Sequence, residues 1–170
     1  MREIQLTRGY IAIVDDDDYE RVSKLKWTAL EDRRKDGSLR TVYPYHSEWI
    51  PETGKPRNVR LNRFILNVTD ETLDVDHRNH NGLDNRKLNL RVCGRSNNLG
   101  NSVRPVNNTS GYKGVVWDKV NRKWRAQIGV NGKSHPLGRF STKEEAACAY
   151  DEAALRQWGE FALTNKAMRL

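Results

Sequence analysis

Residues 73–101 read LDVDHRNHNGLDNRKLNLRVCGRSNNLGN, and aspartate, histidine and asparagine are unusually concentrated in this stretch. Aspartate and asparagine offer hard oxygen ligands, which suit Mg²⁺ or Mn²⁺ better than Zn²⁺. A neutral imidazole can accept a proton from water near pH 7. Hydrolysis of a phosphodiester needs both kinds of group, since a base activates the water and a cation stabilises the charge on the phosphate and the leaving oxygen. The residue types therefore fit a nuclease site.

A purely structural interpretation competes with this one. An Asp-His pair alone is most often a surface or capping pair. Asparagine-rich stretches are usually turns, because asparagine tolerates left-handed backbone and bonds its own main chain. We expect many of these asparagines to be turn residues. The spacing of the whole set, rather than either feature alone, favours the functional interpretation.

That spacing resembles the HNH motif of phage homing endonucleases, in which two strands and a helix hold one divalent ion. Residues 3–66 are more loosely similar to the usual N-terminal segment of that family, with one departure at Asn62, where a histidine is expected. The chain lacks the zinc-binding cysteine pairs that many HNH proteins carry. The residues that carry the resemblance are Asp76-His77, Asn85, Asn89-Leu90-Arg91, Asn98 and Asn101, with Val14-Asp15-Asp16 and Arg63-Phe64-Ile65 in the looser segment.

The resemblance implies a role for each matching polar residue and one ion, Mg²⁺ or Mn²⁺, in each active site, with no zinc expected. It implies metal ligands at Asp76 and Asn98, a general base at His77, a residue at Asn89 that orients His77 or the backbone around it, a loop-pinning residue at Asn85 and, as a weaker candidate, a contact from His80 to the leaving phosphate.

The segment before this motif is expected to form short strands and one helix. The four aspartates at 15–18 suggest a calcium loop at first sight, but the glycine and glutamate that such a loop requires are missing. A helix start is the better interpretation, because carboxylates favour the positive end of a helix. The predicted strands lie around Ile4 and Leu6, at 10–14 and at 41–50, with loops at 31–40 and 51–58.

The segment after the motif predicts a three-stranded sheet backed by one helix. Asn131-Gly132 is a strong hairpin signal between two apolar-polar alternating segments, and Pro136 and Gly138 favour an edge position for the last strand. Two overlapping capping boxes, Ser141 with Glu144 and Thr142 with Glu145, open a helix that ends near Gly159. The predicted strands are 111–117, 123–130 and 133–140.

Positive charge is concentrated in this sheet. The chain holds 30 basic and 22 acidic side chains, but residues 107–143 alone hold eight basic and one acidic. Most of the acids that follow lie in the predicted helix, so the free face of the sheet is expected to be positive. A polyanionic partner fits this distribution.

The same segment is similar to the plant ethylene-response-factor DNA-binding domain, which lays its sheet in the major groove. Plant members carry arginines at the positions of Lys113, Val116 and Gly129, so we expect the docking mode to transfer but not the recognised sequence. The matching segments are Tyr112–Val116, Lys123–Ala126, Leu137–Phe140, Glu145–Ala147, Ala149–Asp151 and Gly159–Asn165.

Nine side chains are candidates for contacts to DNA, although each of them alone could equally be a solvated surface group. Arg125 and Gln127 are the expected base readers, since arginine suits guanine edges and glutamine suits adenine edges, and the others would mainly hold phosphates. The set is Lys113, Trp117, Lys119, Arg122, Lys123, Arg125, Gln127, Lys133 and Arg139.

The chain of 170 residues has room for two small domains. We predict an α+β protein with an HNH module at 1–103 (motif 73–101), a linker at 104–110 and a DNA-binding domain at 111–170. Two cysteines cannot build a disulfide framework, and the apolar runs are far shorter than the roughly 20 residues that span a membrane. We therefore expect a reduced, cytoplasmic protein, encoded by a phage in a bacterial host, without a membrane partner.

These observations predict a metal-dependent DNA endonuclease of the homing type that acts on double-stranded DNA as a monomer or dimer, with no obligatory protein partner. One site per chain predicts a nick by a monomer, and cleavage of both strands would require two chains or a second binding event. The alternative is a DNA-binding regulator that keeps the HNH fold without catalysis. A third class, an RNA-binding structural protein, is less favoured because no aromatic platform of the usual RNA-binding type is visible.

Overall fold

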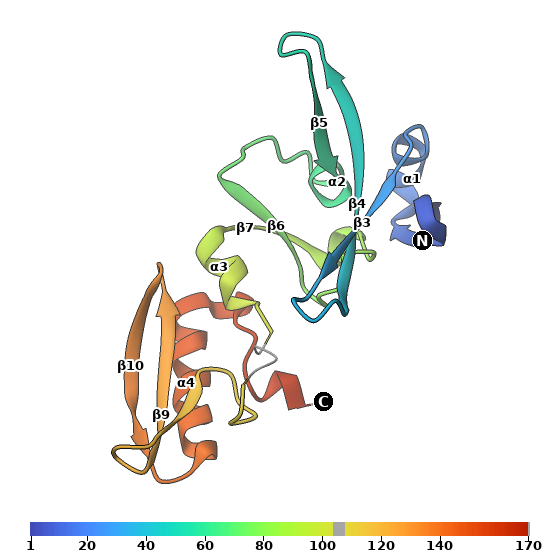
Figure 1. The fold of residues 1–170 in the computed structure, drawn as a ribbon. Helices are drawn as coiled ribbons and strands as arrows, with labels where there is room; N and C mark the ends of the chain where they lie inside the picture. Colours follow the sequence, from blue (N-terminus) through green and yellow to red (C-terminus); the bar gives the residue numbers. More distant parts are fainter. Residues whose placement is uncertain (104–107, 170) are drawn as a thin grey trace. The chain divides into compact units, whose positions relative to one another are not determined.

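A computed structural model of the chain describes residues 1–103 and 108–169, so positions 104–107 of the predicted linker lie outside the described residues. The chain divides into two compact units, Met1–Cys93 and Gly94–Leu170. Figure 1 shows that both units mix helices with small sheets, which confirms the predicted α+β class.

The N-terminal unit consists of three small sheets with short helices between them. Its sheets have the strand orders β1-β2, β3-β4-β5 and β6-β7. The elements are β1 (Arg2–Gln5), η1 (Thr7–Gly9), β2 (Ile11–Val14), α1 (Asp16–Ser23), β3 (Thr28–Arg33), β4 (Leu39–Ile50), β5 (Lys55–Arg60), α2 (Leu61–Ile65), β6 (Leu73–His77), η2 (Lys87–Asn89) and β7 (Leu90–Gly94).

The aspartate run begins α1, as the helix interpretation predicts. Asp16, Asp17 and Asp18 lie in the first turn, where the partial positive charge of the helix end favours carboxylates. Asp18 is buried and forms an ion pair with Arg21 at 2.7 Å. The carboxylate therefore serves a helix start rather than a calcium loop.

The loop predicted at 51–58 is shorter than expected. Strand β5 begins at Lys55 and pairs antiparallel with β4 over six positions, so only residues 51–54 form the turn. Gly54 has φ +62, the left-handed conformation that a tight turn requires. Cross-strand pairing thus overrides the low strand propensity of lysine, proline and asparagine in this segment.

Trp27 lies at the centre of the N-terminal core and is 1% exposed. Its ring stacks edge-on against Phe64 at 5.5 Å between centroids, and its Nε1–H donates to the Val22 carbonyl at 2.9 Å. The remaining core consists of Ile4, Leu6, Ala12, Val14, Val22, Ala29, Val42, Leu61, Ile65 and Leu90.

The C-terminal unit contains a three-stranded antiparallel sheet of order β10-β9-β8, with α4 packed on one face. Its last strand, β10, lies at an edge as predicted. The elements are α3 (Arg95–Gly100), β8 (Val115–Asp118), β9 (Lys123–Val130), β10 (Lys133–Phe140), α4 (Lys143–Trp158), η3 (Gly159–Phe161) and η4 (Ala167–Arg169).

Local signals set most of these boundaries. Asn131 and Gly132 both have positive φ, 51° and 76°, which is the turn expected between β9 and β10. Thr142 and Glu145 form the reciprocal capping box at the start of α4. Strand β8 starts later than predicted, because Gly111 and Gly114 have φ values of 83° and 74° that a strand cannot contain.

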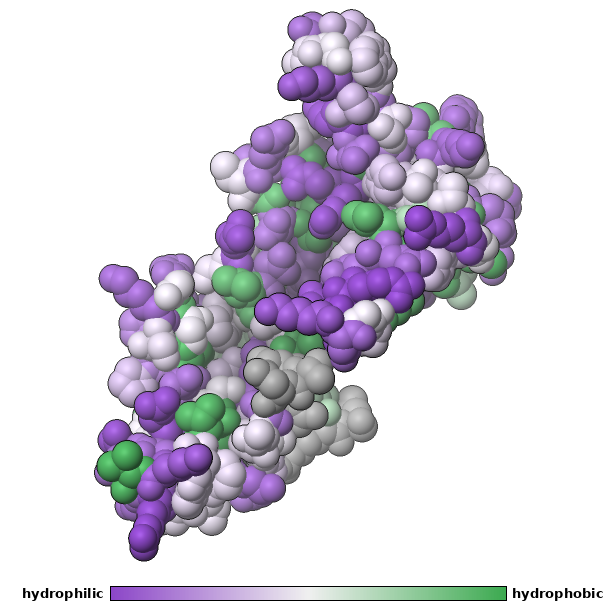
Figure 2. All heavy atoms as spheres, viewed as in Figure 1, coloured by the Kyte–Doolittle hydropathy of each residue, from purple (hydrophilic) through white to green (hydrophobic). Residues whose placement is uncertain are grey.

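Hydrophilic side chains cover most of the face drawn in Figure 2, and the apolar ones form small separate groups. Within residues 1–103 and 108–169, no helix has the length and apolar character needed to cross a membrane.

Candidate functional site

Strand β6 ends in Asp76 and His77, the two residues at the centre of the predicted nuclease site. Both are buried, at 8% and 5% exposure. Successive side chains on a strand point to opposite faces, so the carboxylate and the imidazole leave β6 in opposite directions. Two consecutive residues of one strand thus provide a carboxylate on one face and an imidazole on the other.

Helix α2 holds the backbone of β6 in place. The Asn62 side chain donates from Nδ2 to the Val75 carbonyl at 2.9 Å, and Arg63 donates from Nη1 to the Leu73 carbonyl at 2.6 Å. Asn62 is itself buried. The residue that departs from the family pattern therefore fixes the strand one position before Asp76.

The imidazole of His77 is held by Asn85. The distance between His77 Nε2 and Asn85 Oδ1 is 3.3 Å, and Asn85 Nδ2 donates to the Gly82 carbonyl at 3.0 Å. Because the side-chain nitrogen of Asn85 is bonded to the Gly82 carbonyl, the Asn85 oxygen faces the His77 ring. This oxygen can only accept, so Nε2 carries the proton and Nδ1 carries the lone pair. Asn85 thus both pins the loop and sets the tautomer of His77.

The surroundings of His77 favour its neutral form. Burial lowers the pKa of His77 below its usual value, and the hydrogen bond to Asn85 opposes this only in part. The Tyr43 ring lies 5.9 Å from the His77 ring between centroids. Tyr43 comes from β4, which the sequence motif does not include, so no local signal could have identified it.

The loop between β6 and β7 is tied together by its asparagines, as the turn interpretation predicts. Asn89 accepts at Oδ1 from the Asn79 amide at 3.1 Å and donates from Nδ2 to the Asp84 carbonyl at 2.7 Å. Asn89 therefore holds the backbone around His77. His80 adopts φ 61° in this loop and is half-buried, and its contact to a leaving phosphate stays a prediction.

Strand β2 supports the same loop from outside. The Ile13 amide donates to the Leu83 carbonyl and the Asn85 amide donates to the Ile13 carbonyl, both at 2.8 Å. The N-terminal segment thus fixes Asn85 and, through it, the His77 ring.

The Asp76 carboxylate forms a buried ion pair with Arg91 of β7. Arg91 donates to Asp76 Oδ2 from Nε at 2.9 Å and from Nη2 at 2.7 Å. A buried ion pair offsets the cost of removing both charges from water only when its geometry is good. The motif includes Arg91, but its sequence alone does not reveal this partner.

Asn98, the second predicted metal ligand, lies on α3 and belongs to the C-terminal unit, whereas Asp76 belongs to the N-terminal unit. Carboxylate and carboxamide oxygens are donors that Mg²⁺ and Mn²⁺ accept. In the described part of the chain, no group of three or more His, Cys, Asp or Glu side chains could hold a metal. Binding of one ion by Asp76 and Asn98 together stays a prediction.

The free face of the C-terminal sheet gathers four of the nine predicted DNA contacts. On β9, Lys123, Arg125 and Gln127 lie opposite the face whose Ala126 and Ile128 are buried with α4. Arg139 of β10 pairs with Arg125 in register, so its side chain points to the same face. This face carries the positive charge that the sequence predicts.

A hollow of about 280 Å³ lies on this face, where a bulge between Pro136 and Gly138 interrupts the pairing of β10. Arg125 and Arg139 line it. In the described part of the chain, the buried Arg125 Nε has no hydrogen-bond partner, whereas Arg139 donates to Asp118 at 2.8 Å. This ion pair holds the pKa of Asp118 far below its usual range. A buried donor without an acceptor is costly and fits a site that a ligand completes.

The other five predicted contacts lie elsewhere. Trp117 pairs with Trp124 and Lys133 with Val130, so the register points both side chains to the α4 side of the sheet. Lys119 and Arg122 are exposed in the loop between β8 and β9. Lys113 is 7% exposed, and its ammonium is bonded within the protein, so this arrangement does not favour it as a contact to DNA.

Comparisons with known proteins find a relative that matches nearly the whole chain and others that match part of it. A family model described as the AP2 domain matches residues 110–160. An uncharacterised HNH endonuclease of Acanthamoeba polyphaga mimivirus is 32% identical over 94% of this chain and 76% of its own length. Protein 3.8 of Escherichia phage T7 is 38% identical over 45% of this chain and 63% of its own length.

An ethylene-responsive transcription factor of Arabidopsis thaliana is 45% identical over 33% of this chain, which spans only 14% of that factor. No solved structure matches the chain.

Proposed function

The chain belongs to the HNH endonuclease family and carries an AP2 domain, and on this premise we propose that it is a metal-dependent DNA endonuclease of the homing type. The observation that carries the proposal is His77, an imidazole that burial keeps neutral and that Asn85 orients, directly after the buried carboxylate of Asp76. One such site per chain predicts a nick in one strand of duplex DNA.

The proposed chemistry begins at His77 Nδ1, which takes a proton from a water molecule. The water oxygen attacks the scissile phosphorus, and the bond between phosphorus and the 3′ oxygen breaks. Asn85 holds the tautomer that leaves the lone pair on Nδ1, and Asn89 keeps the surrounding backbone in place. General-base catalysis of this kind contributes about 10²–10⁴-fold.

Asp76 and Asn98 are the residues that would hold the ion. When bound, one Mg²⁺ or Mn²⁺ would stabilise charge on the phosphate and the departing 3′ oxygen. Arg91 bonds one oxygen of Asp76 and thereby fixes the rotation of the carboxylate. A carboxylate has acceptor sites for both a guanidinium and a cation.

The AP2 domain is the proposed reader of the target duplex. Among the described residues, no acceptor bonds the buried Nε of Arg125, which lines a hollow on the basic sheet face, and Gln127 lies two residues further along the same strand. Bidentate contacts from such side chains to base edges discriminate sequences, whereas Lys123 would hold a phosphate. Target choice would then reside mainly in β9.

The rate of nicking should fall on the acid side with a midpoint below about 6.5, the pKa of an ordinary imidazole. Only neutral His77 can accept a proton, and its lowered pKa moves the loss of activity to lower pH. Single-turnover rates from pH 5 to 8 measure this midpoint. The variant Asn85→Asp places a carboxylate beside the ring, so it should move the midpoint to higher pH. An unchanged midpoint in Asn85→Asp would contradict the role of His77 as the base.

Binding to duplex DNA should weaken steeply with salt. If about five phosphates are neutralised, the logarithm of affinity should fall against that of salt concentration with a slope of about −4 to −5. Replacement of Lys123 by Met should reduce the slope by about one, because that side chain would hold a phosphate. Titrations of the full chain in the absence of divalent ions measure this slope. Affinity that does not depend on salt would contradict the proposed interface.

A non-catalytic DNA-binding regulator is the second candidate. One observation favours it, namely that Arg91 already occupies one oxygen of the Asp76 carboxylate. Such a regulator would bind DNA, leave it intact and need no divalent ion. A nicking assay on the wild-type chain separates the two candidates directly.

A further inference from the structure

Helix α3, which carries Asn98, is packed against the AP2 domain through Gly100. A Cβ atom at Gly100 would lie 2.7 Å from the Cγ and Cδ2 atoms of Trp158, so only glycine permits this approach. Trp158 is the last residue of α4 and also donates from Nε1 to the Ser96 hydroxyl at 3.4 Å. Both ends of α3 are thus tied to the last residue of the long helix.

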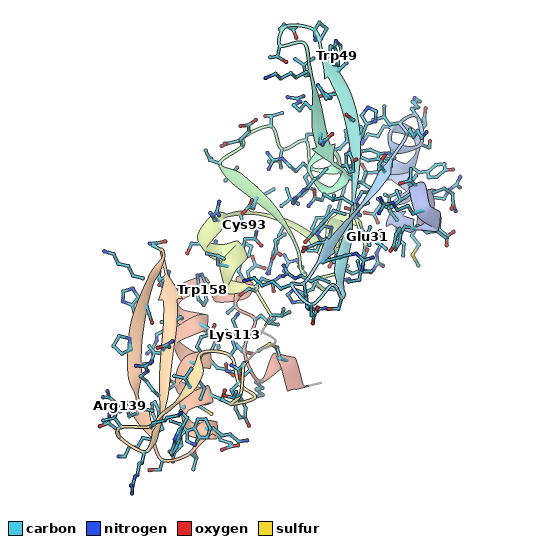
Figure 3. The ribbon with its side chains drawn as sticks, in the orientation of Figure 1. Glu31, Trp49, Cys93, Lys113, Arg139 and Trp158 are labelled. Atoms are coloured by element: carbon cyan, nitrogen blue, oxygen red, sulfur yellow. The ribbon has the colours of Figure 1, made fainter. Side chains whose placement is uncertain are left out.

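The carbonyl of Gly100 is also held by two donors of the C-terminal unit. Lys113 donates from its ammonium at 2.9 Å, and the Leu163 amide donates at 3.2 Å. This carbonyl belongs to the last turn of α3, where no partner within the helix exists. A buried cation at the C-terminal end also complements the helix dipole. Lys113, which is labelled in Figure 3, therefore caps α3 from the AP2 domain.

Lys113 is itself fixed by a buried network. Its backbone amide donates to Asn165 Oδ1 at 2.6 Å, and Asn165 Nδ2 donates back to the Lys113 carbonyl at 3.1 Å. Asn165 in turn donates to Asp151 of α4 from its backbone amide at 2.6 Å. Burial lowers the pKa of Lys113 to about 8, which still leaves the ammonium largely protonated at pH 7. The cap is thus part of the domain core and not a surface contact.

A helix of six residues cannot hold itself in water, since isolated helices are marginal below about 12–15 residues. Packing must therefore stabilise α3. The contacts above supply this from α4, from the segment before β8 and from the chain after η3.

We propose that Lys113 and Trp158 of the AP2 domain are positioning residues that hold the α3 helix and so present Asn98 to the metal. This inference rests on the proposed function for the role of Asn98. It changes the role of Lys113 from a DNA contact to a support of the cleavage chemistry. Binding of DNA by the sheet and placement of a metal ligand then depend on one rigid domain.

The first test replaces Lys113 by Met in the full chain, which removes the ammonium and keeps the apolar stem. We expect the single-turnover nicking rate at saturating DNA to fall at least about tenfold and the affinity for Mn²⁺ to weaken, with DNA affinity and its salt slope unchanged. Lys113→Arg should restore part of the rate, because a guanidinium can still donate to the Gly100 carbonyl. Lys166→Met, a matched change at an exposed lysine of the same unit, should match the wild type.

The second test compares two identical substitutions on α3. Gly100→Ala forces the helix or Trp158 to move, whereas a Cβ at Gly94, the N-cap of the same helix, meets nothing within 4 Å. Amide hydrogen exchange of residues 97–101, measured without metal or DNA, should accelerate at least about tenfold in Gly100→Ala and stay unchanged in Gly94→Ala. The thermal unfolding of each variant reports whether the rest of the domain remains folded.

The outcomes separate this inference from the proposed function. If the wild-type chain does not nick DNA, the proposed nuclease function is overturned. The packing of α3 is still supported if its amides are protected from exchange in the wild type and lose this protection in Gly100→Ala. A Lys113→Met variant with full rate at saturating DNA and a salt slope reduced by about one makes Lys113 a phosphate contact and overturns the inference. Unchanged exchange in Gly100→Ala overturns it as well.

Discussion

Replacement of His77 by alanine is expected to lower the rate of DNA nicking by about 10²–10⁴-fold, because the group that accepts the proton of the attacking water is lost. The rate is measured under single-turnover conditions with enzyme in excess, so that product release does not contribute. DNA affinity should be retained, since the sheet face that we propose as the reader belongs to the other compact unit.

Two controls make this result specific. His135→Ala is a matched change at an exposed histidine of β10 and should keep the wild-type rate. The thermal midpoint of His77→Ala shows whether loss of a buried ring, with its partner Asn85 left behind, has unfolded the site. A folded His77→Ala protein that nicks DNA at the normal rate would remove His77 from the mechanism.

Removal of divalent ions should abolish nicking and leave DNA binding largely intact. A bound cation is worth several kcal/mol of charge stabilisation in the transition state, so its loss corresponds to about 10³-fold or more in rate. Nicking in EDTA should recover when excess Mg²⁺ or Mn²⁺ is added. Binding of the same DNA, measured by titration in EDTA, is the internal control for the integrity of the protein.

The variant Asp76→Asn tests whether Asp76 is a ligand of this ion. The substitution removes the charge that would attract the ion but keeps an oxygen that can accept from Arg91, so the buried guanidinium retains a partner. We expect the concentration of Mg²⁺ needed for half-maximal rate to rise strongly. Both Asp76→Asn and Asp76→Ala leave the buried charge of Arg91 uncompensated, at a cost of about 3–5 kcal/mol, but only Asp76→Asn keeps a hydrogen-bond acceptor for the guanidinium. Nicking at full rate in EDTA would reject the role of a metal.

The sequence allows prediction of elements that local signals determine. Strand β9 has the predicted bounds 123 and 130 because its alternation of polar and apolar residues ends in the Asn131-Gly132 turn. Thr142 begins α4 because its capping box is complete within four residues. The α+β class follows from such segments, each of which can be identified without knowledge of the others.

Contacts between segments that are distant in the sequence could not be predicted. The similarity to the plant domain made Lys113 a predicted DNA contact, and nothing near it in the sequence indicates that its ammonium bonds Gly100, 13 residues earlier. Tyr43 reaches the His77 ring from a strand far upstream. Arg91 is part of the motif, but only the pairing of β6 with β7 brings it to Asp76. The candidate residues were therefore predictable as types, whereas their partners required the fold.

The boundary between Cys93 and Gly94 also bears on how such nucleases could be recombined, by evolution or by design. A chimera joined between residues 103 and 111 would keep α3 but replace Lys113 and Trp158, so the helix would lose the groups that support it. A junction before Gly94 would transfer α3 together with its support. Retargeting by exchange of the DNA-binding domain would therefore have to carry the last ten residues of the HNH segment, 94–103, along with it.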